Sequence, residues 1–99
     1  MKREIFNKYT EQVNEVFRLE DNTIFKKTKK RDIVDARNML YFLCSRRPMR
    51  VSAIQNYMSE GGYDISHTSI LYGIKSIEDK FQEDKDYIST IKKIELCVI

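Results

Sequence analysis

Glycine, proline, cysteine and tryptophan are all scarce in this sequence, which has three glycines, one proline, two cysteines and no tryptophan. So few glycines and prolines argue against a turn-rich β-sandwich or barrel and favour a mostly helical chain. The two cysteines, Cys44 and Cys97, are too few for a disulfide framework or a four-cysteine zinc site. No apolar run approaches the roughly 18 residues that span a membrane, so we expect no membrane partner. The polar start, residues 1–12, is unlike a signal peptide and predicts a cytoplasmic protein.

Catalytic and metal-binding patterns are also missing. The 99 residues suffice for one domain, which we assign to residues 1–99. The single histidine and the scattered carboxylates have no metal-ligand spacing, and no phosphate-loop motif occurs. Cys44 lies in an apolar stripe, where a small core residue is more common than a nucleophile. We therefore expect no enzymatic activity, no cofactor, no metal and no small-molecule substrate.

Apolar residues recur every three or four positions along most of the chain, which is the spacing of amphipathic helices. This spacing predicts five or six helical segments and no strand, hence an all-α fold. The buried stripes that we expect are Ile5–Leu19, Ile33–Leu43, Val51–Met58, Ile70–Phe81 and Tyr87–Ile94.

Helix ends are marked by capping and helix-breaking residues. We expect Asp32 to cap the second long helix and Pro48 to end it. The Gly61-Gly62 pair predicts a tight turn before the next helix. The last segment, residues 84–96, is expected to pack back on the first helix.

The helix after the glycine turn has a polar beginning. Asp64 or Ser66 can cap it, which places its start near His67. The first turn should be exposed, so that His67, Thr68 and Ser69 are available for contact. His67 and Thr68 can hydrogen-bond to base edges, and Ser69 with the free N–H groups of the helix start suits a phosphate oxygen.

Positive charge is concentrated in one quarter of the chain. Residues 26–50 carry a net charge of +7, whereas residues 1–25 carry −1 and residues 51–99 carry −3. The run KKTKKR, residues 26–31, has no apolar spacing and predicts a basic loop. Such a block suits a polyanion, either nucleic acid or an acidic membrane surface. Three further arginines, Arg46, Arg47 and Arg50, either stabilise a helix C-terminus or touch phosphates.

A basic loop, a long helix, a short helix, a glycine turn and a polar-tipped helix follow one another in this chain. This order is typical of a helix-turn-helix DNA-binding protein, with the motif at about residues 51–80. In particular, residues 66–78 (SHTSILYGIKSIE) run without gaps alongside the signature Gly-Arg-Asp-His-Thr-Thr-Val-Leu-His-Ala, a basic residue and Lys-Ile-Glu. The chain thereby resembles the C-terminal DNA-binding domain of the bacterial replication initiator DnaA, over roughly residues 12–80. The resemblance implies a small, Trp-repressor-like helical bundle that binds double-stranded DNA.

The resemblance also implies roles for individual residues. In the basic loop, Lys29 would enter the minor groove, with Arg31 beside it and Lys27 and Lys30 in the same run. His67 and Thr68, with Ser66, would contact bases. The residues implied to lie near phosphates are Arg37, Asn38, Val51, Ser52, Ser69 and Lys75.

Three departures from the family signature predict an altered DNA target. Ile65-Ser66 replaces Arg-Asp, Ser69 replaces the second threonine, and Asp35-Ala36 replaces Arg-Pro. A serine is a shorter, neutral substitute for an aspartate that accepts from a cytosine amino group. With no ATPase module in 99 residues, we expect a free-standing protein, for which a phage is one source.

The expected function is therefore sequence-specific binding of double-stranded DNA in replication initiation or its regulation, in the cytoplasm on the nucleoid. One alternative is a protein–protein module that regulates a host replication protein, since Ile65 and Tyr72 are expected on the exposed side. Another alternative is a transcriptional repressor, which differs only in where its DNA sites lie. Other replication proteins are candidate partners in the first two cases.

Overall fold

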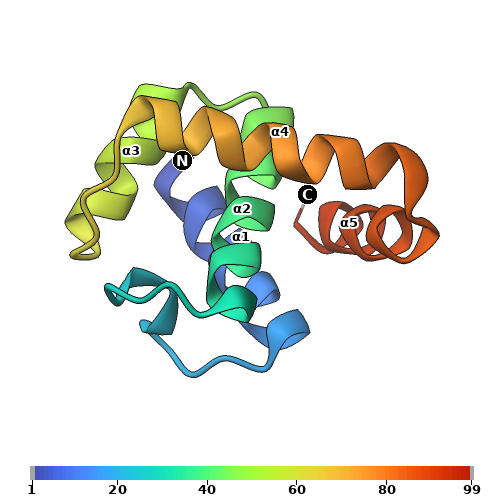
Figure 1. Cartoon of the computed structure of the whole chain (residues 1–99), viewed down its shortest axis with the longest axis horizontal. Coiled ribbons are helices and arrows are strands. Elements are labelled where there is room, and N and C mark those ends of the chain that lie inside the picture. The colour runs from blue at the N-terminus through green and yellow to red at the C-terminus, as the bar shows by residue number, and fades with distance from the viewer. Residues whose placement is uncertain (1, 99) are drawn as a thin grey trace.

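Helix α2 (Arg31–Arg46) forms the centre of the molecule (Figure 1). Residues 39–44 of this helix are all buried, so that α2 is surrounded on every side there. Helix α1 (Lys2–Phe17) packs on one side of α2, and α4 (His67–Glu83) crosses it on another. A helix buried all round is apolar on all faces, which is why the run MLYFLC shows no amphipathic spacing.

The computed structural model describes residues 2–98, and within them it contains helices but no strand. A 3₁₀ turn, η1 (Thr23–Phe25), precedes α2, and α3 (Val51–Glu60) and α5 (Lys85–Cys97) complete the order α1, η1, α2, α3, α4, α5. The all-α fold expected from the sequence is therefore confirmed. In this described part of the chain, no helix is both long and apolar enough to span a bilayer.

Most helix ends lie where the sequence predicts them. Helix α2 ends at Arg46, two residues before Pro48, and α3 ends at Glu60, directly before the glycine pair. The start of α2 differs, because it begins at Arg31 with Lys30 as N-cap instead of after a cap at Asp32. Asp32 lies in the first turn, where its carboxylate accepts from the Ile33 backbone N–H at 2.9 Å. The basic loop therefore covers residues 26–30, and Arg31 is helical.

The core is a single cluster to which every helix contributes. Its largest fully buried aliphatic side chains are Val13, Ile24, Leu40, Leu43, Ile54, Met58, Ile70, Ile77 and Ile91. Cys44 belongs to this cluster and is fully buried, and burial raises the pKa of its thiol. Because a raised pKa keeps the sulfur in its unreactive thiol form, the core role expected for Cys44 is confirmed.

Close approach of α4 to α2 depends on Gly73. A Cβ atom at this position would lie 2.4 Å from the Asn38 Oδ1 atom and 3.2 Å from the Tyr41 ring. These contacts are shorter than van der Waals separation, so a side chain at residue 73 would push the two helices apart.

We expect Gly73→Ala to lower the free energy of unfolding by about 1 kcal/mol. Overpacking costs about 1–3 kcal/mol, and the better helix propensity of alanine returns about 1 kcal/mol of it. Urea denaturation measures the difference, with Ser76→Ala, about one turn further along α4, as the matched control. An increase in stability for Gly73→Ala would show that the α2–α4 contact is not tight.

Helix α5 packs mainly against α4, and a groove of about 600 Å³ lies between it and α1. The segment that was expected to pack back on the first helix thus packs mainly on α4 and faces α1 across this groove. Asp84 alone connects the two helices, so α5 must begin beside the end of α4 (Figure 1).

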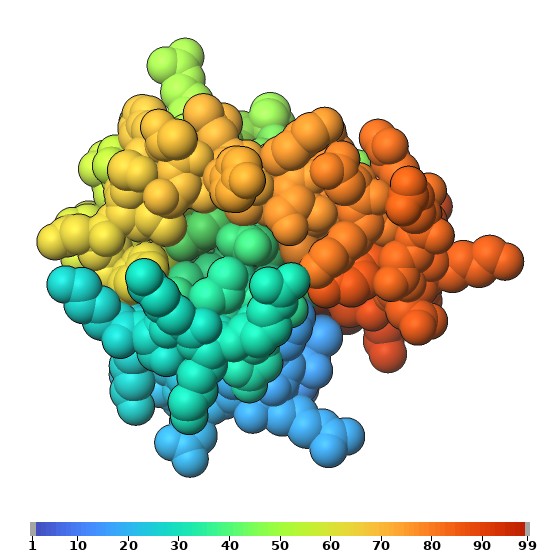
Figure 2. Space-filling model, in the orientation of Figure 1, coloured from blue at the N-terminus to red at the C-terminus, as the bar shows by residue number. Residues whose placement is uncertain are grey.

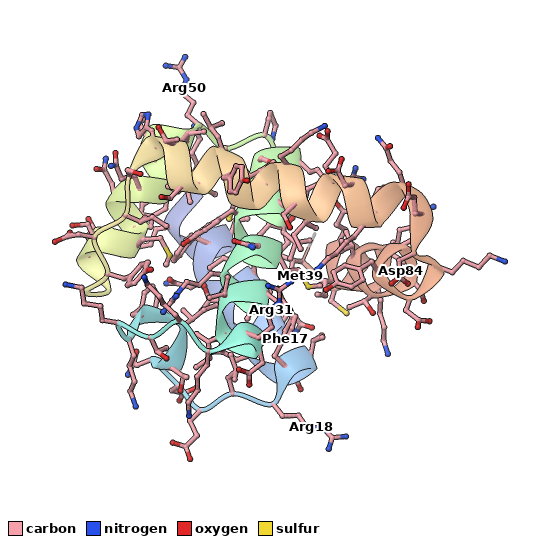
Figure 3. All side chains as sticks on the ribbon, in the orientation of Figure 1. Phe17, Arg18, Arg31, Met39, Arg50 and Asp84 are labelled. Carbon is pink, nitrogen blue, oxygen red and sulfur yellow. The ribbon has the colours of Figure 1, made fainter. Side chains whose placement is uncertain are left out.

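Two arginines at the end of α2 also hold the C-terminal segment. The Arg46 guanidinium donates to both carboxylate oxygens of Glu95, at 2.7 and 3.3 Å, and Arg47 donates to the Val98 carbonyl. These arginines have structural partners, whereas the Arg50 side chain extends into solvent (Figure 3).

Candidate nucleic-acid interface

The first turn of α4 is held by its cap. Ser66 is the N-cap, and its hydroxyl oxygen accepts a hydrogen bond from the Ser69 backbone N–H at 3.1 Å. The same hydroxyl donates to the Ser69 Oγ atom at 3.0 Å. Of the two caps that the sequence allowed, Ser66 is used, while Asp64 accepts from the Ser59 hydroxyl at 2.9 Å.

His67 and Thr68 are both exposed at this helix start, as the sequence predicted. Their backbone N–H groups belong to the first turn and have no carbonyl partner within the helix. Together with the dipole of a 17-residue helix, they make this end attractive to an anion. Both side chains carry hydrogen-bonding groups suited to base edges.

The basic loop runs from η1 to α2 and exposes its lysines. Lys26, Lys27, Lys29 and Lys30 are all exposed, so their ammonium groups are open to solvent. Within the loop, the Thr28 hydroxyl accepts from the Lys30 backbone N–H at 3.3 Å. Four cations in five residues repel one another, so something else must hold the backbone in place.

Arg37 of α2 provides that support. Its guanidinium donates to the Ile24 carbonyl at 2.7 Å, to the Thr28 carbonyl at 3.0 Å, and to the Lys26 carbonyl. Its Cζ atom also lies 4.1 Å from the centre of the Tyr63 ring, in the segment that leads into α4. Arg37 therefore connects the basic loop to the start of α4.

The expected phosphate contact from Arg37 is corrected by this geometry. The residue is only 4% exposed, and its guanidinium donates to three backbone carbonyls. Sequence alone does not distinguish such an arginine from a surface one, because burial depends on which segments fold over it.

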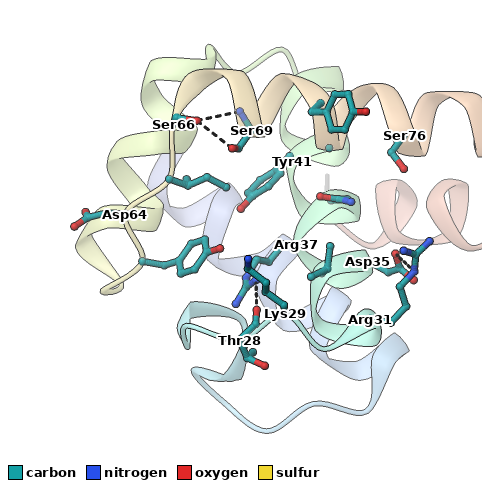
Figure 4. A pocket seen from close by; sticks show the side chains of 16 residues that line it. Thr28, Lys29, Arg31, Asp35, Arg37, Tyr41, Asp64, Ser66, Ser69 and Ser76 are labelled. Atoms are coloured by element: carbon teal, nitrogen blue, oxygen red, sulfur yellow. Dashed lines mark hydrogen bonds and ion pairs between the residues drawn. The ribbon is translucent and has the colours of Figure 1, made fainter.

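The basic loop and the start of α4 lie on one face of the molecule. Figure 2 shows both segments in the same view, with a hollow between them that α2 floors. This hollow is a cavity of about 530 Å³, with Thr28 and Lys29 on one side and Ser66 and Ser69 on the other (Figure 4). The two segments that the sequence singled out are thus brought to opposite sides of one cavity.

The start of α3 is tied to the same region. Ser52 is exposed and Val51 half-buried in its first turn. One turn later, the Gln55 side-chain amide donates to the Ile65 carbonyl at 2.8 Å. This bond holds α3 against the segment before α4.

The remaining predicted residues have mixed surroundings. Asn38 is half-buried beside Gly73 and lines the cavity. Lys75 is exposed on α4, but its ammonium lies 3.4 Å from the Asp79 carboxylate, which offsets part of its charge. Arg31 is exposed and lies 3.7 Å from the Asp35 carboxylate.

Two further residues, one in the cavity and one on the surface of α4, were not predicted from the sequence. Tyr41 lines the cavity, although its place in the run MLYFLC indicates only a core position. Leu71 is 54% exposed on α4, next to Tyr72, which is 81% exposed. Leu71 does not belong to the apolar stripe Ile70, Ile74, Ile77, and this spacing could have predicted its exposure.

Among residues 2–98, no group of three or more histidine, cysteine or carboxylate side chains is placed to hold a metal. Comparison with protein-family models finds no match, and comparison with curated proteins finds none either. The resemblance to the DnaA domain accordingly remains a prediction from the residues.

Proposed function

We propose that this protein binds double-stranded DNA, with the start of α4 in the major groove and the basic loop in the adjacent minor groove. The observation that carries the proposal is the common face: Lys29 of the basic loop and Ser66 and Ser69 of the α4 start line one cavity. His67 and Thr68, between those two serines, and the other lysines of residues 26–30 are exposed. A duplex lying across this face would meet hydrogen-bonding groups from α4 and positive charge from the loop.

The pair α3 and α4 would act as the helix-turn-helix. The short connection after Gly61-Gly62 and the bond from Gln55 to the Ile65 carbonyl hold the second helix at a defined angle. In such motifs the second helix contacts bases with its N-terminal residues, and the first helix crosses the backbone. The resemblance of residues 66–78 to the DnaA signature supports the same orientation. Replication initiation or its regulation is the role that follows from it.

Affinity and sequence choice would come from different residues. Lysines of the loop and the N–H groups at the start of α4 contact phosphates, which are the same in every sequence. His67 and Thr68 would contact base edges, and the Thr68 methyl group can also pack on a thymine methyl. The Ser66 hydroxyl already donates to the Ser69 Oγ atom and accepts from the Ser69 N–H. Only its remaining lone pair would be available to accept a hydrogen bond from a base.

The proposal is tested by selecting bound fragments from random duplex DNA and measuring variants on the selected site. We expect His67→Ala and Thr68→Val each to weaken binding to this site by about 1–3 kcal/mol, with little effect on random DNA. Thr68→Val keeps the branched shape and replaces the hydroxyl with a methyl group. Ser89→Ala on α5 is the control.

Equal losses on selected and random DNA would remove the base-contact role of these two residues. Failure to select any common sequence would contradict sequence-specific binding as a whole. The positions of selected sites relative to promoters or replication origins would then separate a transcriptional repressor from a replication protein.

A protein–protein module is the second candidate function, favoured by the apolar surface of α4. Leu71 and Tyr72 are neighbouring exposed apolar residues on the helix proposed to face DNA. Such a module would regulate a replication protein by contact with this surface. It predicts weak DNA binding that changes little with salt, opposite to the first proposal.

A further inference from the structure

The base of the cavity between the basic loop and α4 is formed by Tyr41. Its side chain is 1% exposed, and its hydroxyl has no hydrogen-bond partner among the described residues. Figure 4 shows the Tyr41 ring between the Ser66 and Ser69 pair on one side and Arg37 and Lys29 on the other. The DNA-binding proposal makes no use of this hydroxyl.

A buried hydroxyl without a partner is rare, because it gives up its bonds to water and gains none. Burial raises the pKa of Tyr41 above its usual range; Tyr63 raises it further, and the positive charge of Arg37 offsets part of the rise. The phenol therefore keeps its proton and can donate it in a hydrogen bond. What the position requires is an acceptor that enters the cavity.

Other groups around the cavity also have donors to offer. The Lys29 ammonium is exposed at the rim, and within residues 2–98 the hydroxyl protons of Ser69 and Ser76 have no acceptor. The two carboxylates of the lining are already engaged. Asp35 lies 3.7 Å from Arg31, and Asp64 accepts from a serine hydroxyl.

We propose that this cavity binds the phosphate group of a small phosphorylated molecule, with the Tyr41 hydroxyl, the Ser69 hydroxyl and the Lys29 ammonium as donors. Phosphate oxygens accept several hydrogen bonds at once, and the start of α4 adds a favourable dipole. The volume of about 530 Å³ falls in the range of small-molecule sites. A phosphate within a duplex is held in the backbone by two ester bonds and stays at the rim, whereas the phosphate of a small monoester is free to enter the cavity.

The regulatory consequence rests on the proposed DNA-binding function. A phosphate held between the basic loop and α4 would occupy donors and oppose the positive charge that DNA needs. The small molecule and the DNA would then weaken each other's binding by the same factor. The binding site itself does not depend on DNA and can be tested without it.

The test is a titration of the whole chain with methyl phosphate at constant ionic strength, followed by NMR of the tyrosine rings. We expect saturable shifts of the Tyr41 signals in the wild type. Tyr41→Phe removes only the hydroxyl and should weaken binding about tenfold, as expected for a hydrogen bond to a charged group. Ser69→Ala is a second, exposed variant with a smaller expected loss, and Tyr87→Phe on α5 is the control.

Three outcomes would overturn the proposal. One is no saturable shift with methyl phosphate in the wild type, and another is equal affinity in Tyr41→Phe, Ser69→Ala and the control. The third is a shift of the Tyr41 signals with duplex DNA but not with methyl phosphate. That result would assign the phosphate to the DNA backbone. If the wild-type protein binds methyl phosphate but does not bind DNA, the proposed function is contradicted and the phosphate site still stands.

Discussion

The affinity of this protein for duplex DNA is expected to fall by about 10²- to 10³-fold as the salt concentration rises from about 50 to about 200 mM. Each phosphate that a lysine or arginine neutralises releases condensed counterions, and added salt opposes that release. With about four to six phosphates neutralised, log affinity should fall against log salt with a slope of roughly −3.6 to −5.4. The exposed lysines of residues 26–30 are the main source of this effect.

Two triple variants with the same change in charge locate the effect. Replacing Lys27, Lys29 and Lys30 with glutamine should reduce the slope by roughly 2.7, because about three phosphate contacts are lost. Replacing the exposed α5 residues Lys85, Lys92 and Lys93 with glutamine should leave the slope nearly unchanged. Fluorescence anisotropy over a salt series measures both. A flat salt dependence in the wild type would contradict the electrostatic basis of the proposal and favour the protein–protein module.

Replacement of Arg37 by lysine is expected to lower the free energy of unfolding by about 3 kcal/mol. The guanidinium holds the Ile24, Lys26 and Thr28 carbonyls at once, whereas an ammonium has a different shape and cannot reproduce this fork. The contact with the Tyr63 ring would weaken as well. Since the charge is kept, any loss must come from geometry.

The same variant should weaken binding to all DNA sequences at temperatures where it remains folded. Its loop would no longer be held beside the α4 start, although every lysine is still present. Urea denaturation and anisotropy measure the two effects. Arg50→Lys is the matched control, and its exposed side chain predicts a change within about 0.5 kcal/mol. A stable Arg37→Lys protein with normal DNA affinity would show that the loop does not need this support.

Helix positions were predictable because their signals are local. Pro48, the glycine pair and the Ser66 cap each act on neighbouring backbone, and each marks a helix end within two residues of its observed position. The start of α2 was misplaced because an aspartate favours both the cap and the first turn of a helix. At the α4 start, local sequence also sufficed to predict the exposure of His67 and Thr68.

The roles of Arg37 and Tyr41 were not predictable, because each depends on segments distant in the sequence. Arg37 carries a charge, so the sequence predicts a surface position for it. In the structure, η1 and the basic loop fold over it and accept its hydrogen bonds. Tyr41 has the sequence neighbours of a core residue, yet its hydroxyl lies at the base of a cavity that α4 borders on one side. The partner of α5, by contrast, follows from a local feature, its one-residue connection to α4.

The helices, the concentration of charge at residues 26–50 and the polar beginning of α4 follow from local sequence, since backbone capping and apolar periodicity are properties of short segments. The common face of the basic loop and that helix start, and the cavity with a buried hydroxyl between them, arise from the packing of distant segments. The reason is physical: packing of α1, α4 and η1 around α2 sets distances and burial, and no short segment specifies these alone.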